Sequence, residues 1–237
     1  MRSLSLSIIA LSLTACALNV GGEADIPLSA VAARADSGVS AAAVSEAVVA
    51  ASPDVALLAG PPDEAWFRAV AEATGLHLSG PASTADLGMA FLAREPVGDT
   101  TIRLPYDGGT LTLQDALYDL GDRRFLDLLA FEIEDASVAR TAIGALLEYV
   151  ATDVMNSAAV VMAVAVPSPA AGDSVARMLS PGYYDALRCE GGEAATAARG
   201  GLRVFYGPEA RVYCENATAE DTGLGDWVRA SLVLGRR

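Results

Sequence analysis

Apolar residues recur along most of the chain with the spacing of helices, and this pattern predicts several of them. The segment before Gly75 has Pro62 in its first turn and acidic residues at the positive end of its dipole, and Gly75 is its stop. Ser137 is a predicted cap for a long amphipathic helix. Predicted helices cover residues 40–51, 62–75, 112–120, the first half of 123–133, 138–155, 175–179 and 181–187.

Other segments have the pattern of strands. Residues 100–104 and 110–113 alternate around the turn Tyr106–Gly109 and predict a hairpin. Residues 158–166 are apolar throughout and end at Pro167, which predicts a central strand covered by helices. Three later segments predict an antiparallel meander, namely residues 202–206, 211–214 and 227–234. The sequence therefore predicts an α+β fold with helices packed on a small sheet that has a central apolar strand, plus a C-terminal β-meander.

The first sixteen residues have the features of an export signal. Arg2 precedes an uncharged run, 4–13, which has the length of a secretory h-region and is shorter than the roughly 20 residues of a transmembrane helix. The sequence Leu13-Thr14-Ala15-Cys16 then resembles the lipobox of bacterial lipoproteins. The resemblance implies a diacylglycerol on the Cys16 thiol, cleavage before Cys16 and acylation of the new amine. An ordinary secretory signal with an incidental cysteine is the alternative.

The lipobox resemblance also sets the expected location and domain organisation. Acyl chains together give stable anchoring, and Ala17 in place of aspartate favours the outer membrane over the inner one. We expect the protein on the periplasmic side of a bacterial membrane. The predicted parts are a signal peptide over 1–15, a lipid-anchored tether over 16–39, an α+β main domain over 40–187 and a disulfide-tied β-meander over 188–237, packed on the main domain.

Charge restricts the partners. The chain has 16 Lys and Arg against 30 Asp and Glu, a formal net charge of −14, and all its cations are arginine. This balance argues against nucleic acid, whose binding depends on cations that neutralise phosphates. It also argues against electrostatic contact of the folded part with anionic lipid. The expected partners are therefore the membrane, through the N-terminal lipid, and an envelope protein.

The remaining cysteines predict a disulfide. Cys189 and Cys214 stay unassigned once Cys16 carries lipid, and export places them in an oxidising compartment. A bridge closing a loop of about 25 residues is worth roughly 3 kcal/mol. The alternative, a pair of metal ligands, has no further Cys or His nearby.

Side chains for nucleophilic catalysis are sparse. The single histidine, His77, lies close to Ser79 and Ser83, but the chain has no G-x-S-x-G elbow. Because His77 follows a helix stop, we expect it to bond the last carbonyls of that helix. The glycine pairs Gly108-Gly109 and Gly200-Gly201 lack a phosphate-binding fingerprint. No catalytic residue, metal ligand or cofactor is assigned.

Acidic residues are plentiful but do not single out a site. The densest acidic loop has no EF-hand spacing; its possible calcium ligands are Asn216, Glu220, Asp221 and Asp226. Asp221-Thr222-Gly223 matches the triplet of aspartic proteases, but only once. Glu132 and Glu134 alternate along a strand and are interpreted as its solvated face.

The sequence therefore predicts a non-catalytic structural, assembly or binding lipoprotein of the cell envelope. Two alternatives remain open. A periplasmic hydrolase acting through carboxylates would show a pocket with two acids about 5–10 Å apart. A small-ligand carrier would show a closed apolar cavity.

Overall fold

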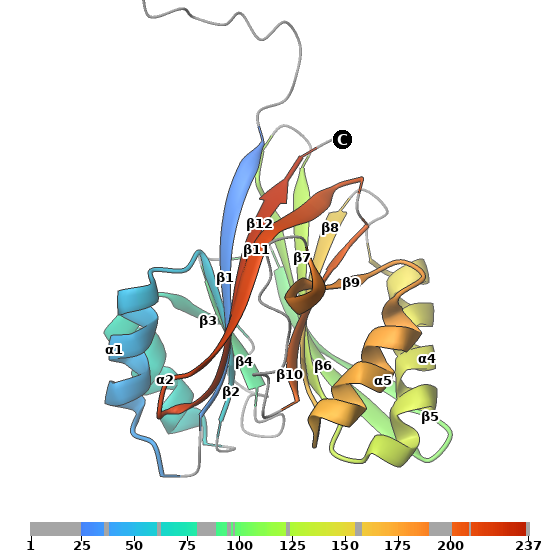
Figure 1. The fold of residues 1–237 in the computed structure, drawn as a ribbon, viewed down its shortest axis with the longest axis horizontal. Helices are drawn as coiled ribbons and strands as arrows, with labels where there is room; N and C mark the ends of the chain where they lie inside the picture. The colour runs from blue at the N-terminus through green and yellow to red at the C-terminus, as the bar shows by residue number, and fades with distance from the viewer. Residues whose placement is uncertain are drawn as a thin grey trace, which may run out of the picture.

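The protein is a sandwich of two mixed β-sheets between two layers of helices (Figure 1). The computed structural model describes residues 25–35, 38–60, 63–79, 89–93, 96, 98–121, 124–154, 158–189, 201–208 and 210–235. The predicted signal peptide and Cys16 lie outside these residues. The α+β class expected from the sequence is confirmed, but the layers are formed by two six-stranded sheets instead of one small sheet.

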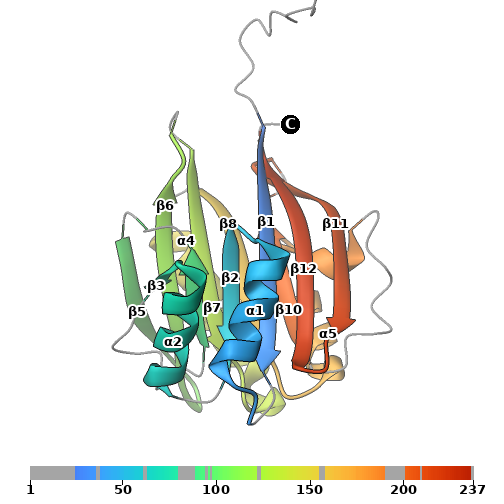
Figure 2. The ribbon, with the colours of Figure 1, turned by 90° about the vertical axis from the view of Figure 1, so that its left-hand side faces the viewer.

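Sheet A has the strand order β11-β12-β1-β2-β4-β3. Strand β1 runs parallel to β2 and antiparallel to β12. Figure 2 looks onto this sheet from the side of its two covering helices. The strands are β1 (Ile26–Ala35), β2 (Val55–Ala59), β3 (His77–Ser79), β4 (Met89–Ala93), β11 (Val212–Asp221) and β12 (Gly225–Leu234).

Sheet B has the strand order β5-β6-β7-β8-β10-β9. Strand β7 runs parallel to β8, and the other neighbouring strands run antiparallel. The strands are β5 (Gly98–Tyr106), β6 (Gly109–Asp119), β7 (Phe125–Glu132), β8 (Ala158–Ala165), β9 (Tyr184–Asp185) and β10 (Leu202–Gly207).

Each sheet contains one parallel pair joined by a helix. Helix α1 (Ala41–Ala51) connects β1 to β2, and α4 (Ala139–Thr152) connects β7 to β8. Helices α2 (Glu64–Thr74) and α5 (Pro169–Leu179) complete the two outer layers. Two short 3₁₀ helices, η1 (Ala136–Val138) and η2 (Ala186–Arg188), precede α4 and follow β9.

Local chemistry explains where the helices begin and end. The side chains of Ser40, Asp63 and Ser168 accept hydrogen bonds from the first turns of α1, α2 and α5. Gly75 ends α2 in the left-handed conformation, at φ 70°, which a glycine adopts without steric cost. These helices confirm the predictions for 40–51 and 62–75.

Apolar side chains fill three layers. Between the sheets lie small and medium residues such as Ala30, Leu57 and Val161. Trp227 and Phe67 are buried between sheet A and its helices, and Phe131 is buried between sheet B and α4. Every residue of β8 is buried because one face meets the other sheet and the opposite face meets helices. The predicted central apolar strand at 158–166 is thereby explained.

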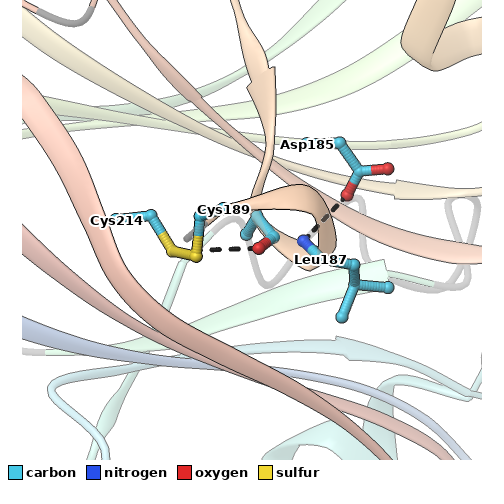
Figure 3. Close-up of a disulfide and its surroundings, with 5 residues drawn as sticks. Asp185, Leu187, Cys189 and Cys214 are labelled. Carbon is cyan, nitrogen blue, oxygen red and sulfur yellow. Dashed lines mark hydrogen bonds between the residues drawn. A yellow bond between two sulfur atoms is a disulfide. The ribbon is translucent and has the colours of Figure 1, made fainter. Parts of the chain in front are cut away.

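A disulfide joins the two sides of the sandwich. Cys189 follows η2, Cys214 lies in β11, and their Cα atoms are 6.0 Å apart (Figure 3). The carboxylate of Asp185 accepts a hydrogen bond from the backbone N–H of Leu187 and so caps η2. The predicted pairing of Cys189 with Cys214 is confirmed.

The predicted tether over 16–39 is wrong for residues 26–35. These form β1, which lies between β12 and β2 in sheet A. Both faces of β1 are buried, Ala30 and Ala32 against sheet B and Val31 against the helices. Its many alanines have little hydrophobic character one by one, so the segment lacks the periodicity that marks a half-buried strand.

Two predicted helices in the middle of the chain are strands. Of the predicted helix over 112–120, residues 112–119 belong to β6, and the predicted helix in the first half of 123–133 is replaced by β7. Both strands are buried on both faces, so their apolar residues do not alternate. The hairpin predicted around Tyr106–Gly109 is confirmed as the β5–β6 pair.

The predicted C-terminal meander divides between the sheets. Strand β10 pairs with β8 and β9 in sheet B, whereas β11 and β12 pair in sheet A. The helix predicted at 181–187 is instead the short strand β9 followed by η2. The expected boundary at residue 188 therefore does not separate an appendage from a main domain, because β12 pairs along its whole length with β1.

Candidate functional site

The carboxyl ends of the two parallel strand pairs meet at one end of the sandwich. Arg34 lies near the end of β1, and Glu132 ends β7. A guanidinium nitrogen of Arg34 lies 2.5 Å from Oε1 of Glu132, and another donates to the carbonyl oxygen of Val166 at 3.2 Å. This ion pair links sheet A to sheet B at corresponding positions of the two strand–helix–strand units.

A pocket of about 340 Å³ opens beside Glu132. It lies between the β5–β6 turn and the start of α4, and its walls carry three carboxyl side chains, those of Glu132, Glu134 and Asp135. Backbone and hydroxyl groups of the β6 strand, including Thr110 and Thr112, complete its polar lining. The pocket is therefore polar and acidic, with one paired carboxylate at its edge.

The local environments move the pKa values of two of these acids in opposite directions. Burial raises the pKa of Glu132, although the Arg34 guanidinium works against this rise. The pKa of Asp135 is lowered because its carboxylate accepts a hydrogen bond from the backbone N–H of Ser137 at 2.8 Å. Environments that separate the pKa values of two neighbouring acids are typical of acid–base pairs.

The hydrogen bond from the backbone N–H of Ser137 also holds the Asp135 carboxylate in position. Asp135, and not Ser137 as predicted, caps the 3₁₀ turn η1 that leads into α4. Asp135 is exposed, whereas Glu132 is half-buried, with 27% of its side chain exposed. The interpretation of Glu132 as part of a solvated strand face is therefore wrong, and the exposed Glu134 fits it.

The neighbouring strand ends are closed by large side chains or close backbone contacts. Gly60 follows β2, and a Cβ atom there would lie 3.1 Å from the ring of Trp66. Gly201 precedes β10 at φ 73°, and a Cβ there would lie 2.5 Å from the carbonyl oxygen of Val166. In the part of the chain that the structure describes, the pocket at this end lies on the side of β7 and α4.

A second acid pair is buried deeper in sheet B. Asp115 of β6 lies near Asp127 of β7, and the hydroxyl of Tyr149 on α4 donates a hydrogen bond to Asp115. Burial and the neighbouring Asp115 raise the pKa of Asp127 to about 8. Burial and the same acids raise the pKa of Tyr149. Both carboxyl groups are more than nine-tenths buried, so this pair has little access to a substrate.

His77 has an acidic partner instead of the predicted helix carbonyls. It begins β3, and its Nε2 lies 3.8 Å from Oδ2 of Asp99 on β5. Ser79 is completely buried two residues later on the same strand, and Ser83 lies outside the described residues. His77 and Asp99 thus form a contact between the edges of the two sheets.

The residues considered for calcium do not gather. Asn216 pairs with Ser231, and Asp226 pairs with Asp221, five register positions further along the β11–β12 hairpin. The side chains of Glu220 and Asp221 lie outside the described set. Among the described residues, no group of three or more His, Cys, Asp or Glu side chains is arranged to hold a metal ion. Within the same ranges, no helix has the length and apolar character to cross a membrane.

Comparison with known proteins identifies the fold. No family model matches the sequence, and no curated protein sequence matches it significantly. Solved structures do match. A protein of Bacteroides vulgatus described as an endonuclease/exonuclease/phosphatase superimposes with a TM-score of 0.64 at 9% identity, over 88% of this chain and 99% of that one.

Two further structures show the same likeness. TDP2 of D. rerio, solved with a single-strand DNA product, matches with a TM-score of 0.60 at 13% identity, over 87% of this chain and 98% of its own. An endonuclease/exonuclease/phosphatase of Beutenbergia cavernae matches with a TM-score of 0.60 at 15% identity, over 88% of this chain and 72% of its own. At these identities the likeness shows the fold alone.

These likenesses correct the functional prediction. The expected non-catalytic structural, assembly or binding role, with its leaning against an enzyme, is contradicted by a fold shared with proteins described as endonuclease/exonuclease/phosphatases. The hydrolase alternative is the better supported one. The prediction relied on the lack of a recognisable catalytic motif in the sequence, but residues far apart in sequence can meet through the packing of the two sheets, as Arg34 and Glu132 do across 98 positions.

Proposed function

We propose that the protein is a hydrolase whose catalytic groups are Glu132 and Asp135. The observation that carries the proposal is that these two acids line one pocket and that their pKa values are moved apart. The fold likeness supports it, because the sandwich is one used by proteins named as nucleases and phosphatases. The pocket lies beside the carboxyl end of β7, and in α/β sheets the carboxyl ends of parallel strands commonly carry ligand sites.

The two acids have different roles in the proposed reaction. Glu132, with its raised pKa, keeps a proton to higher pH than an ordinary glutamate and delivers it to the leaving oxygen; the ion pair with Arg34 is the state after this proton has left. Asp135, with its lowered pKa, stays ionised and accepts a proton from the attacking water. Arg34 holds the Glu132 carboxyl at the edge of the pocket. The water supplies the hydroxyl group of one product, and the proton from Glu132 completes the other.

Phosphate esters are the substrate class to which the names of the structural neighbours point. The net charge of −14 favours a small ester over a nucleic-acid polymer. The ionised Asp135 carboxylate in the pocket would repel an anionic phosphate unless its charge is compensated. An uncharged ester or glycoside avoids this repulsion and serves as the comparison substrate.

The proposal is tested with the purified protein and chromogenic substrates. Nitrophenyl phosphate mono- and diesters and nitrophenyl glycosides are assayed with Mg²⁺ and, in parallel, with EDTA. We expect hydrolysis of at least one class, and we expect Glu132→Gln and Asp135→Asn to remove it. Glu148→Gln, an exposed acid on α4, is the matched control. No hydrolysis of any class, or equal activity in all three variants, would overturn the proposal.

We propose further that lipid on Cys16 anchors this hydrolase on the periplasmic side of a bacterial membrane, the outer membrane being favoured. The lipobox resemblance of Leu13-Thr14-Ala15-Cys16 supports it. Intact mass measurement should find a diacylglycerol on Cys16, and Cys16→Ala should leave the chain unprocessed or soluble. A processed Cys16→Ala protein that stays in the membrane fraction would contradict the anchor.

A further inference from the structure

An apolar pocket of about 290 Å³ opens between the sheets at the end opposite the acidic pocket. It is formed by the amino ends of β1, β2 and β7 together with the carboxyl ends of β6 and β12. Its walls are mostly aliphatic, and they include Ile26, Leu28, Tyr118, Leu120, Leu128 and Leu234. A volume near the lower end of the range of ligand pockets, roughly 300–1,000 Å³, suits part of one aliphatic chain.

The place of the pocket points to a particular occupant. Ile26 is the first residue of β1 and lines the pocket, so the N-terminal segment joins the fold at this opening. Ten residue steps separate Cys16 from Ile26, and an extended chain spans at most about 3.6 Å per residue, or about 36 Å in total. A lipid carried on Cys16 is therefore within reach of the pocket.

Charge favours an esterified acyl chain over a free fatty acid. Asp54 lines the pocket, and its Oδ2 accepts a hydrogen bond from the backbone N–H of Ser29 at 2.8 Å. A free fatty acid would bring a second carboxylate to this position on a chain of net charge −14. The acyl chains of a diacylglycerol are uncharged along their whole length, so they enter without this repulsion.

We propose that one acyl chain of the lipid on Cys16 inserts into this pocket of its own protein. The proposal rests on the lipid anchor proposed above and is independent of the hydrolase assignment. The remaining acyl chains keep the protein in the membrane, because stable anchoring needs more than one hydrophobic group. The apolar end of the sandwich then lies against the membrane surface, and the acidic pocket faces away from it.

Photo-crosslinking tests the insertion directly. The full chain is expressed in a bacterial host that matures lipoproteins and is fed a diazirine-labelled fatty acid, which enters the lipid on Cys16. Isolated membranes are irradiated, and the cross-linked peptides are identified by mass spectrometry. We expect cross-links within the same chain, concentrated on the peptides that contain Leu120 and Leu128.

A pair of matched variants makes the test specific. Leu120→Trp fills the pocket and should lower the intramolecular cross-links at least fivefold. Leu147→Trp changes another half-buried leucine, which lines a separate cavity of about 320 Å³ beside α4, and should leave them unchanged. If Leu120→Trp does not fold by circular dichroism, Ile26→Trp blocks the same pocket from its partly exposed edge.

The outcomes separate the anchor from the insertion. A chain whose mass shows no diacylglycerol on Cys16 overturns both. A lipidated chain with cross-links only to membrane lipids, or spread evenly over its surface, overturns the insertion and leaves the anchor. Equal cross-linking in the Leu120 and Leu147 variants overturns it as well. None of these results bears on the hydrolysis assay, which uses the opposite end of the fold.

Discussion

The two ends of the sandwich are built by the same strands but have opposite chemistry. At their carboxyl ends, β1 and β7 bring Arg34 and Glu132 together beside an acidic pocket. At their amino ends, the same strands contribute Ile26 and Leu126 to an apolar pocket. Between the two, mainly alanine, leucine and valine fill the space between the sheets.

The difference shows how one strand can serve two sites. The middle of each strand is buried on both faces and, apart from Asp127 of β7, carries mostly apolar side chains. This requirement is relaxed at the ends, and there the chain places either a charged or an aliphatic side chain. Variants at the acidic end should therefore change hydrolysis and leave the apolar pocket unchanged, and variants at the apolar end should do the reverse.

The largest expected effect is at the acidic end. Glu132→Gln removes the proposed proton donor but keeps the size of the side chain, so kcat/KM should fall by about 10²–10⁴. Thermal unfolding and cross-linking of the Cys16 lipid at the opposite end should stay as in the unchanged protein. A variant that keeps its activity would place the donor elsewhere, and a variant that also loses the cross-links would show that the two ends are coupled.

The disulfide should stabilise the fold, and it lies close to the apolar end of the sandwich. Cys214 is the register partner of Leu232 in β12, which in turn pairs with Leu28 of the apolar pocket. The double variant Cys189→Ala/Cys214→Ala should lower the free energy of unfolding in urea by about 3 kcal/mol, because a loop of about 25 residues is no longer closed.

The unchanged protein with the bridge intact, unfolded in the same urea series, is the reference for this measurement. Loss of the disulfide should leave the hydrolytic activity of the folded protein at the acidic end unchanged. Unchanged stability of the double variant, or free thiols at both positions in the purified protein, would contradict the structural role of the bridge.

The buried acid pair between the two ends should make stability depend on pH. Because the pKa of Asp127 rises from 3.8 to about 8 on folding, the native state binds more protons than the unfolded state between these values. Stability should therefore fall as pH rises from about 4 to about 8. Asp127→Asn cannot ionise, so at pH 8.5 it should be the more stable protein by on the order of 2 kcal/mol.

The comparison uses thermal unfolding from pH 4.5 to 8.5. Asp107→Asn, an exposed acid in the β5–β6 turn, should follow the unchanged protein across this range. Parallel curves for all three proteins would mean that Asp127 is ionised throughout and that the pair does not share a proton.

The smallest effect is expected from replacing Arg34, and it should appear in the pH profile of the activity. Because its guanidinium lowers the pKa of Glu132, Arg34→Met should raise that pKa further. The alkaline limb of the activity profile should then move to higher pH by up to about one unit, with at most about 1 kcal/mol lost from stability. Arg68→Met breaks an exposed ion pair with Glu64 on α2 and is the control. A profile that moves to lower pH would contradict the assigned role of Glu132.

The sequence was most informative where an element buries one face. Helices 40–51, 62–75 and 138–155 correspond to α1, α2 and α4, each of which packs one side against a single sheet and keeps the helical period. Strands β1, β6 and β7 are buried on both faces, and their patterns predicted a tether and helices. The periodicity of apolar residues along one segment does not show whether a second layer covers its other face.

The candidate site was harder to predict than the fold class. Glu132 has the same alternating position as Glu134, and only the packing of the second sheet brings Arg34 to one of them. The position of Asp135 could have been predicted, because an aspartate just before a helix commonly accepts a hydrogen bond from the backbone N–H two residues later. The cap alone carries no chemistry, so the acid pair could be recognised only once the pocket was seen.

The pairing of β1 with β12 has a consequence for engineering. Ile26 and Leu234 are register partners in neighbouring antiparallel strands, so the two ends of the folded chain lie only about 5 Å apart. A short linker could join them, and new termini could be opened in the β5–β6 turn with the sheet order preserved. A tag fused after residue 235 would emerge beside the start of β1, and an internal tag in that turn would leave this end uncovered.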